Sequence, residues 1–361
     1  MLEAILLVGG QGTRLRPLTL SAPKPMLPVA GVPCTTHQIA RARAAGVDHV
    51  VLGTSYQADV FRSAYGHGEG LGVQLTYAHE ETPLGTGGSL RNVAEHLRSG
   101  PDDPVLVFNG DVLSGFDIEA LVAHWRDARA DVALYLTRVE DPRPFGLVPT
   151  DAQHKVLAFL EKPSTPEEIV TDQINAGCYV FRRSLLDEIP AGRPVSVERE
   201  TFPGLLQSGA HVIGHVDTSY WLDLGTPLAF VRGSADLVRG IAPSPAVVGS
   251  NGEALIHASA QVAADAQVSA GSAVGRNCIV HSGAKVLGSV LMDGVVIGAG
   301  AVVRDSVVGR STRIGAGTHL HEAVIGDNCD IGAHNEFTSG ARVWPETALP
   351  DMAVRFSAEP A

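Results

Sequence analysis

Glycines precede a group of cations near the N-terminus, where residues 6–31 read LLVGGQGTRLRPLTLSAPKPMLPVAG. An apolar run ends in three glycines within four residues, and Arg14, Arg16 and Lys24 follow. Backbone N–H groups that no side chain covers, close to positive charge, suit anionic oxygens. The pattern therefore predicts that this loop binds an anionic ligand.

Two well-known phosphate-binding loops do not fit this segment. A P-loop needs a Gly-Lys-Ser/Thr triplet, and none follows the glycines at the required spacing. A dinucleotide-binding loop needs a third glycine where Leu15 stands. The simplest alternative is a tight strand-to-helix turn whose arginines are solvated.

The composition limits the classes of function. With 361 residues, 45% of them hydrophobic, the chain is long enough for two domains and apolar enough for a full core. The formal net charge of −12 disfavours nonspecific binding to nucleic acid or to an anionic membrane. We therefore expect neither a nucleic-acid partner nor a membrane partner.

The N-terminus and the cysteines predict a cytoplasmic protein. Glu3 and the glycines interrupt the first apolar run, so it does not read as an export signal, and no stretch approaches the roughly 18 apolar residues of a membrane span. The four cysteines form no C-x-x-C pair, which fits a reducing compartment and argues against a thiolate metal site. The fourteen histidines form no H-E-x-x-H cluster.

Two halves of the chain follow different periods. Over residues 1–240, apolar strands (3–8, 49–55, 73–80, 104–111) alternate with amphipathic helical stretches (37–46, 58–65, 87–97). Such alternation predicts βαβ units and a parallel-rich sheet, in which ligands bind beyond the carboxyl ends of the strands, where residues 9–13 fall. A segment rich in Pro, Gly and Ser, residues 241–253, reads as a linker.

The second half repeats. From residue 254 to residue 350 aliphatic residues recur every six positions, and groups that begin at Val274, Leu291, Val308 and Ile325 follow one another every 17 residues. Small residues follow the aliphatic ones, as tight corners require. The period predicts a solenoid with three flat faces in each coil, and residues 351–361 form a tail.

These features resemble a known family. The run GGQGTRL followed by KPMLPV resembles the signature of sugar-1-phosphate nucleotidyltransferases, and the repeats resemble the left-handed parallel β-helix of hexapeptide-repeat proteins. The resemblance implies an α/β fold: a Rossmann-like nucleotidyltransferase domain with a mixed, mostly parallel sheet, followed by a left-handed parallel β-helix. It also implies transfer of a nucleotidyl group from an NTP to a sugar 1-phosphate, with release of pyrophosphate.

The resemblance assigns residues to the phosphates, the nucleotide and the metal. Arg14 would stabilise the departing phosphates, Lys24 would contact the transferring phosphate, and Mg²⁺ would bind Asp111 and Asp223. Taken alone, Asp111 could be a turn residue and Asp223 a helix cap. Asp111 also belongs to the expected nucleotide-binding set, whose other members by resemblance are Leu7, Gly9, Gly10, Gln11, Gly12 and Thr13.

The sugar side comes from four further segments. In FLEKP, Lys162 would hold the sugar phosphate, as a third catalytic residue, and Glu161 a sugar hydroxyl. The other expected sugar-binding residues are Gly146, Asn175, Gly177 and Glu198, of which Glu198 is equally readable as a charge on a helix face.

The segment HEETPLGTGGSL is expected to select the base, and it is similar to the E-x-x-P-L-G-T-A-G run of guanylyltransferases. Guanine presents N1–H and N2–H₂ donors on one edge, and an ionised carboxylate can accept from both. We assign Glu80 to the guanine, with Glu81 as the alternate and Gly85 admitting the base. Both acids could instead be solvated loop residues.

The chain as a whole resembles the GDP-mannose pyrophosphorylases, which implies GTP and mannose 1-phosphate as substrates, a GDP-sugar and pyrophosphate as products, and a homo-oligomer. Alternatives are a glucose-1-phosphate thymidylyl- or uridylyltransferase, a guanylyltransferase for a heptose, and a catalytically silent homologue that senses an NDP-sugar. Acyl transfer by the solenoid is a further alternative, because the repeats contain His281, His319, His321 and His334.

Overall fold

The computed structural model describes residues 1–55 and 57–355 and divides the chain into two compact units. The first unit comprises residues 1–10 and 38–221, and the second comprises residues 11–37 and the chain from residue 222 onward. The loop of residues 9–27, called the glycine loop below, is divided after Gly10. Its residues 9 and 10 belong to the first unit and its residues 11–27 to the second. The boundaries predicted from composition (1–240, 241–253, 254–350 and 351–361) stay predictions.

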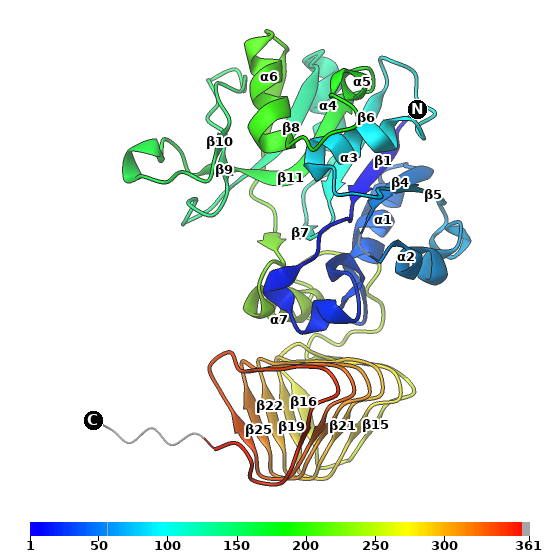
Figure 1. Ribbon diagram of the computed structural model, residues 1–361, viewed down its shortest axis with the longest axis vertical. Coiled ribbons are helices and arrows are strands. Elements are labelled where there is room, and N and C mark those ends of the chain that lie inside the picture. Colours follow the sequence, from blue (N-terminus) through cyan, green and yellow to red (C-terminus); the bar gives the residue numbers. More distant parts are fainter. Residues whose placement is uncertain (56, 356–361) are drawn as a thin grey trace. The chain divides into compact units, whose positions relative to one another are not determined.

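One mixed sheet organises the first unit (Figure 1). In the described residues its central order is β10-β9-β11-β6-β1-β4-β5, and β8 lies between β11 and β12. Strands β6, β1, β4 and β5 are parallel, whereas β11 runs antiparallel to β6 and β8. The strands are β1 (Glu3–Leu7), β4 (His49–Thr54), β5 (Gln74–His79), β6 (Pro104–Asn109), β8 (Val132–Arg138), β9 (Gly146–Leu147), β10 (Leu160–Glu161), β11 (Gln173–Arg182) and β12 (Val212–Val216).

Helices connect these strands, as the alternating pattern predicts. The described helices of this part are α1 (Cys34–Ala44), α2 (Ala58–Tyr65), α3 (Gly85–Ala94), α4 (Ile118–Asp127), α5 (Leu185–Glu188) and α6 (Phe202–Gln207). The prediction of a mixed, mostly parallel α/β sheet is confirmed. None of the helices within the described ranges combines the length and apolar character that crossing a bilayer requires.

A buried, hydrogen-bonded carboxylate fastens the start of β1. The Glu3 side chain is fully buried, its Oε1 lies 2.5 Å from His49 Nδ1, and the backbone N–H groups of Arg98 and Ser99 donate to its Oε2 at 2.9 and 2.6 Å. Burial by itself would raise the pKa of Glu3, but these hydrogen bonds outweigh burial and lower the pKa to about 2. The strand that leads to the glycines is thus fixed at its first residue.

Stacked parallel strands form most of the second unit, as expected for a left-handed β-helix (Figure 1). The aliphatic residues predicted to point inward, such as Val280, Ile297, Ile314 and Ile331, line one core and are at most 2% exposed. Three sheets share the strands: β14 (Ala254–Ile256), β17 (Ser272–Val274), β20 (Val290–Leu291), β23 (Val307–Val308), β26 (Val324–Ile325) and β29 (Arg342–Val343); β15 (Gln261–Val262), β18 (Ile279–Val280), β21 (Val296–Ile297), β24 (Arg313–Ile314), β27 (Asp330–Ile331) and β30 (Ala348–Leu349); β16 (Gln267–Ser269), β19 (Lys285–Leu287), β22 (Val302–Arg304), β25 (His319–His321) and β28 (Glu336–Phe337).

The register confirms the repeat length. Val290, Val307 and Val324 are successive partners, so these coils are 17 residues long, whereas the pairs Ile256–Val274 and Val324–Arg342 show 18-residue coils towards the two ends.

Helix α7 (Pro227–Val238) packs against the first coils of the second unit. It begins at Thr226, whose hydroxyl accepts the N–H of Ala229 at 3.2 Å, with Pro227 at the first helical position. A side chain on Gly271 would come within 2.7 Å of Ala235 Cβ, so the helix and the coil are in close contact there.

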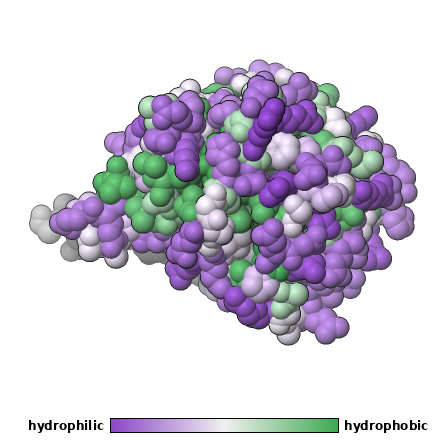
Figure 2. Space-filling view, turned by 90° about the horizontal axis from the view of Figure 1, so that it is seen from above, coloured by the Kyte–Doolittle hydropathy of each residue, from purple (hydrophilic) through white to green (hydrophobic). Residues whose placement is uncertain are grey.

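The surface seen in Figure 2 is mainly hydrophilic, with one region where hydrophobic residues gather. This agrees with a chain of net charge −12 whose aliphatic residues are largely used in two cores.

Candidate active site

The glycine loop folds back on itself at Gly12. Gly12 has φ +59°, and a Cβ on it would lie 2.7 Å from Lys24 Cβ and 2.9 Å from Thr19 Cγ2. The Thr19 hydroxyl donates to the Gly12 carbonyl at 2.9 Å, and Leu15 is fully buried below the turn. Gly12 therefore serves the close approach of the Lys24 segment as well as a left-handed turn.

Three of the predicted residues meet in the second unit. Lys24 Nζ lies 3.7 Å from Asp223 Oδ1, and Arg14 Nη2 lies 3.9 Å from Asp223 Oδ2. The Lys24 side chain is only 10% exposed, whereas that of Arg14 is 66% exposed. Gly225 makes this possible, because a Cβ there would lie 2.6 Å from Arg14 Nη2 and 2.9 Å from Asp223 Oδ2.

The carboxyl end of β1 lies beside that of β6 in the first unit. The Gly110 N–H donates to the Leu7 carbonyl at 3.0 Å, at the end of the strand that leads to Gly9. Asp111 is the next residue after this contact. The Ser55 hydroxyl donates to the Gly9 carbonyl at 2.7 Å, and a Cβ on Gly10 would meet nothing within 4 Å. Gly10 thus presents open backbone, as close approach by a ligand requires.

The two base-reading candidates differ in their surroundings. Glu80 is 7% exposed and its Oε2 accepts the N–H of Leu84 at 3.1 Å, whereas Glu81 is exposed. The hydrogen bond fixes the Glu80 carboxylate and leaves its other oxygen for a further donor, which favours Glu80. A Cβ on Gly85 (φ +69°) would lie 2.6 Å from the Val195 carbonyl oxygen, so packing already requires a glycine there.

The sugar-binding candidates on β9 and β10 lie together. A side chain on Gly146 would come within 2.7 Å of Glu161 Oε2 and 2.8 Å of Phe159, so glycine leaves the Glu161 carboxylate room. Lys162 Nζ lies 3.2 Å from Glu161 Oε1, with the Lys162 side chain 60% exposed and that of Glu161 16% exposed. The lysine thus reaches solvent beside a sheltered carboxylate.

Asn175 and Gly177 lie where β11 departs from regular pairing with β8. Asn175 Oδ1 accepts the Gly177 N–H at 3.1 Å, and its Nδ2 donates to the Tyr179 hydroxyl at 2.8 Å. Because β9 pairs with β11 at Ile174, this irregularity lies close to the Gly146 pair. Four of the sugar-binding candidates thus belong to neighbouring strands.

Glu198 contacts the base segment in the described structure. Its Oε2 accepts the Thr86 hydroxyl at 2.8 Å and the Ser196 hydroxyl at 3.0 Å.

Tyr179, the partner of Asn175, stays protonated. Burial raises the pKa of the Tyr179 phenol well above its usual value, and the Glu198 carboxylate raises it further. Thr86 and Tyr179 are not among the residues predicted from the sequence, since neither residue carries a pattern of its own.

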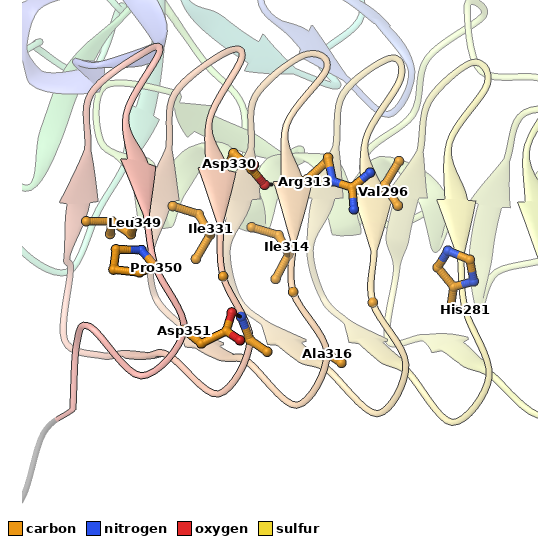
Figure 3. A pocket seen from close by; sticks show the side chains of 14 residues that line it. His281, Val296, Arg313, Ile314, Ala316, Asp330, Ile331, Leu349, Pro350 and Asp351 are labelled. Carbon is orange, nitrogen blue, oxygen red and sulfur yellow. Dashed lines mark hydrogen bonds and ion pairs between the residues drawn. The ribbon is translucent and has the colours of Figure 1, made fainter.

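The solenoid carries a hollow of its own, shown in Figure 3. Its lining includes His281, the ion pair of Arg313 with Asp330, and Asp351. None of the described residues that line it belongs to the predicted nucleotide, sugar or metal set. The other histidines considered for acyl transfer, His319, His321 and His334, are exposed on the strands and turns of the coils.

A metal would have to be held by few protein ligands. Among residues 1–55 and 57–355 there is no group of three or more His, Cys, Asp or Glu residues that could hold an ion. Mg²⁺ commonly takes one or two carboxylates, with phosphate and water oxygens completing the shell. The Asp223 carboxylate, a hard donor that is 26% exposed, fits such a site in its chemistry.

Both parts of the chain match models of known families. Residues 3–240 match the nucleotidyl transferase family, and residues 250–355 match the GMPPB C-terminal domain. The chain therefore belongs to the nucleotidyl transferase family.

Similar proteins specify the branch. Mannose-1-phosphate guanylyltransferase of Mycobacterium tuberculosis is 58% identical over 358 residues, which cover 99% of this chain and 98% of the relative. The mannose-1-phosphate guanylyltransferase catalytic subunit beta of Xenopus tropicalis is 36% identical over 242 residues, 66% of each chain. The crystal structure of HddC from Yersinia pseudotuberculosis has a TM-score of 0.57 at 24% identity, covers 66% of this chain and 100% of that one, and supports the fold alone. The predicted family resemblance is confirmed.

Proposed function

We propose that the protein transfers GMP from GTP to mannose 1-phosphate and yields GDP-mannose and pyrophosphate. The observation that carries this proposal is the 58% identity to a mannose-1-phosphate guanylyltransferase over nearly the whole chain. The cluster of Lys24, Arg14 and Asp223 supports it, because the reaction must bring two polyanions together.

Charge neutralisation is the first task of the site. A phosphate oxygen of the sugar 1-phosphate attacks the α-phosphorus of GTP, and repulsion between the two substrates opposes this approach. We assign Lys24 to the transferring phosphate, because a cation that is 90% shielded from solvent interacts strongly with nearby charge. Arg14, which is exposed and planar, is assigned to the departing phosphates.

The cofactor is proposed to be Mg²⁺ with Asp111 and Asp223 as its protein ligands, as the family resemblance implies. Such an ion supplies Lewis-acid stabilisation of the charge on the phosphate oxygens. Asp223 is paired with two cations in the described structure, so its carboxylate is oriented before substrates arrive. The glycine backbone at residues 9, 10 and 12, with Leu7, Gln11 and Thr13, is assigned to the nucleotide.

The base and the sugar are assigned to the first unit. Glu80 accepts the guanine donors, and its bond from the Leu84 N–H holds the carboxylate in place. Glu161 accepts a sugar hydroxyl, Lys162 holds the sugar phosphate, and Asn175 contacts the ring. The remaining members of the proposed sugar set are Gly146, Gly177 and Glu198.

Further parts of the proposal concern assembly and compartment. We propose a homo-oligomer, in line with the family resemblance, and a cytoplasmic location, which the four buried free cysteines support.

Parallel assays test the proposed function. Pyrophosphate release is measured with GTP, dTTP and UTP, each with mannose 1-phosphate, glucose 1-phosphate and a manno-configured heptose 1-phosphate. The pair GTP and mannose 1-phosphate is expected to give the highest kcat/KM. If GTP is the poorest nucleotide, the assignment of Glu80 to guanine is wrong, and if no pair releases pyrophosphate, the enzyme class is wrong.

A further inference from the structure

The loop that carries Arg14 and Lys24 makes two polar contacts with the β-helix. The Ser21 hydroxyl donates to Asp327 Oδ2 at 2.8 Å, and Arg342 Nη1 donates to the Arg16 carbonyl at 2.7 Å. Arg16 follows Arg14 by two positions, and Ser21 precedes Lys24 by three. The two contacts therefore fix the loop at positions close in sequence to Arg14 and Lys24.

Asp327 differs from the aspartate at the same corner two repeats earlier. In both of these coils the aspartate Oδ1 accepts a backbone N–H: Asp293 accepts that of Arg276 at 2.8 Å, and Asp327 accepts that of Arg310 at 2.7 Å. Asp293 is exposed, but Asp327 is only 7% exposed and turns its second oxygen to Ser21. Within the solenoid, Arg310 thus contacts both oxygens of Asp327, because its Nη1 lies 3.6 Å from Oδ2, and Oδ2 in addition accepts the hydroxyl of Ser21 in the loop.

Arg342, which donates to the loop, also lies near the segment that follows Asp223. It lines a small hollow together with Thr226, Pro227 and Leu228, which form the start of α7, and with Asp305 and Glu322 of the coils. Because Gly225 lies directly before this start, these coils contact the loop that carries Lys24 and share a hollow with the segment that follows Asp223.

We infer, on the basis of the proposed function, that Asp327 and Arg342 are positioning residues for nucleotidyl transfer: through Ser21 and Arg16 they hold Arg14 and Lys24 in register with Asp223. The β-helix thus acts on the reaction without touching substrate. A loop freed from these contacts keeps its sequence and its cations but loses their common orientation, and small displacements of such groups lower rates strongly.

A double-mutant cycle tests the link through Ser21. Ser21→Ala and Asp327→Asn are each expected to lower kcat with GTP and mannose 1-phosphate about tenfold. Asparagine keeps an oxygen for the Arg310 N–H, so this backbone hydrogen bond is retained, whereas the ion pair with the Arg310 side chain is lost. The double variant is expected to be no slower than Asp327→Asn alone, because that substitution already removes the carboxylate that accepts the Ser21 hydroxyl. Asp293→Asn is the control for the backbone hydrogen bond at the corner, and Arg310→Gln is the control for the ion pair with Asp327; both are expected to keep wild-type kcat.

Arg342 gives a second, independent arm. Arg342→Ala is expected to lower kcat about tenfold, and Arg342→Lys, which still offers a donor to the Arg16 carbonyl, to restore part of it. The KM for mannose 1-phosphate is expected to stay unchanged, since the proposed sugar residues lie outside this loop. Hydrogen exchange of the amides of residues 15–27 is expected to be faster in Ser21→Ala and Arg342→Ala.

The outcomes separate this inference from the proposed function. Wild-type kcat and unchanged exchange in Ser21→Ala and Arg342→Ala would overturn the inference, and so would an equal loss in Asp293→Asn and Asp327→Asn. If the wild-type protein prefers another nucleotide, the proposed function fails, and the same variants are compared with that nucleotide. If it turns over none, hydrogen exchange alone decides whether the β-helix holds the loop.

Discussion

Replacing Gly12 by alanine tests the loop geometry most directly. A left-handed conformation costs a non-glycine residue about 1–2 kcal/mol, and Gly12 has φ +59°. The new Cβ would lie 2.7 Å from Lys24 Cβ, and crowding of this kind costs a further 1–3 kcal/mol, roughly. The free energy of unfolding is therefore expected to fall by about 2–5 kcal/mol.

The same substitution is expected to lower the rate. Relief of the crowding moves the Lys24 backbone away from the turn, and a shift of about 1 Å in a catalytic group costs about a hundredfold in rate. We expect kcat for pyrophosphate release with GTP and mannose 1-phosphate to fall by this order. Denaturant unfolding and steady-state kinetics on one preparation measure both effects.

Gly10→Ala serves as the comparison. A Cβ on Gly10 would meet nothing within 4 Å, so the free energy of unfolding is expected to stay within about 0.5 kcal/mol of wild type. Any loss of activity in Gly10→Ala then comes from contact with the nucleotide and raises the KM for GTP. A Gly12→Ala protein with wild-type stability and wild-type kcat would refute the reasoning.

Four further predictions concern charge and metal. In Gly225→Ala the new Cβ displaces the exposed Arg14 side chain, so kcat is expected to fall about tenfold with little change in stability, and a wild-type kcat would exclude Arg14 from the phosphates. Glu80→Gln is expected to raise the KM for GTP about tenfold and leave that for mannose 1-phosphate unchanged; equal changes in both would count against guanine recognition. Because the pKa of Glu3 is about 2 when folded against 4.5 ordinarily, its carboxylate stabilises the fold by about 3 kcal/mol above pH 4.5, and this stability is lost as the pH falls towards 2. Glu3→Gln is therefore expected to flatten the stability profile across that window, and an unchanged profile would contradict the role of the pair with His49. EDTA is expected to abolish turnover and Mg²⁺ to restore it, and turnover that persists in EDTA would contradict the proposed cofactor.

Local periodicity made most of the fold predictable. The strand and helix alternation before residue 240 and the 17-residue repeat after residue 254 are set by burial of apolar faces, and the corresponding elements form where the pattern places them. The cluster of Lys24 with Asp223 was predictable only through the family motif, because nearly the whole catalytic half separates the two residues in sequence.

Contacts between remote segments account for what was missed. The hydrogen bond of Thr86 to Glu198 and that of Ser21 to Asp327 join residues that no common period relates. Gly85 was predicted as a place where the base approaches, yet the nearest atom to a Cβ there is the Val195 carbonyl oxygen. Such close contacts arise only when the backbone is folded, so a sequence pattern does not predict them.

The repeat of the β-helix would normally tolerate insertion or deletion of whole coils, because each coil contacts only its neighbours. Here α7 contacts β17 and the glycine loop contacts Asp327, three coils further along. Removing one intervening coil would shift that aspartate by about 4.8 Å relative to the helix, beyond the reach of the serine hydroxyl. The length of this stretch of solenoid is therefore fixed by the distance it must span, and evolution can add or remove coils freely only beyond it.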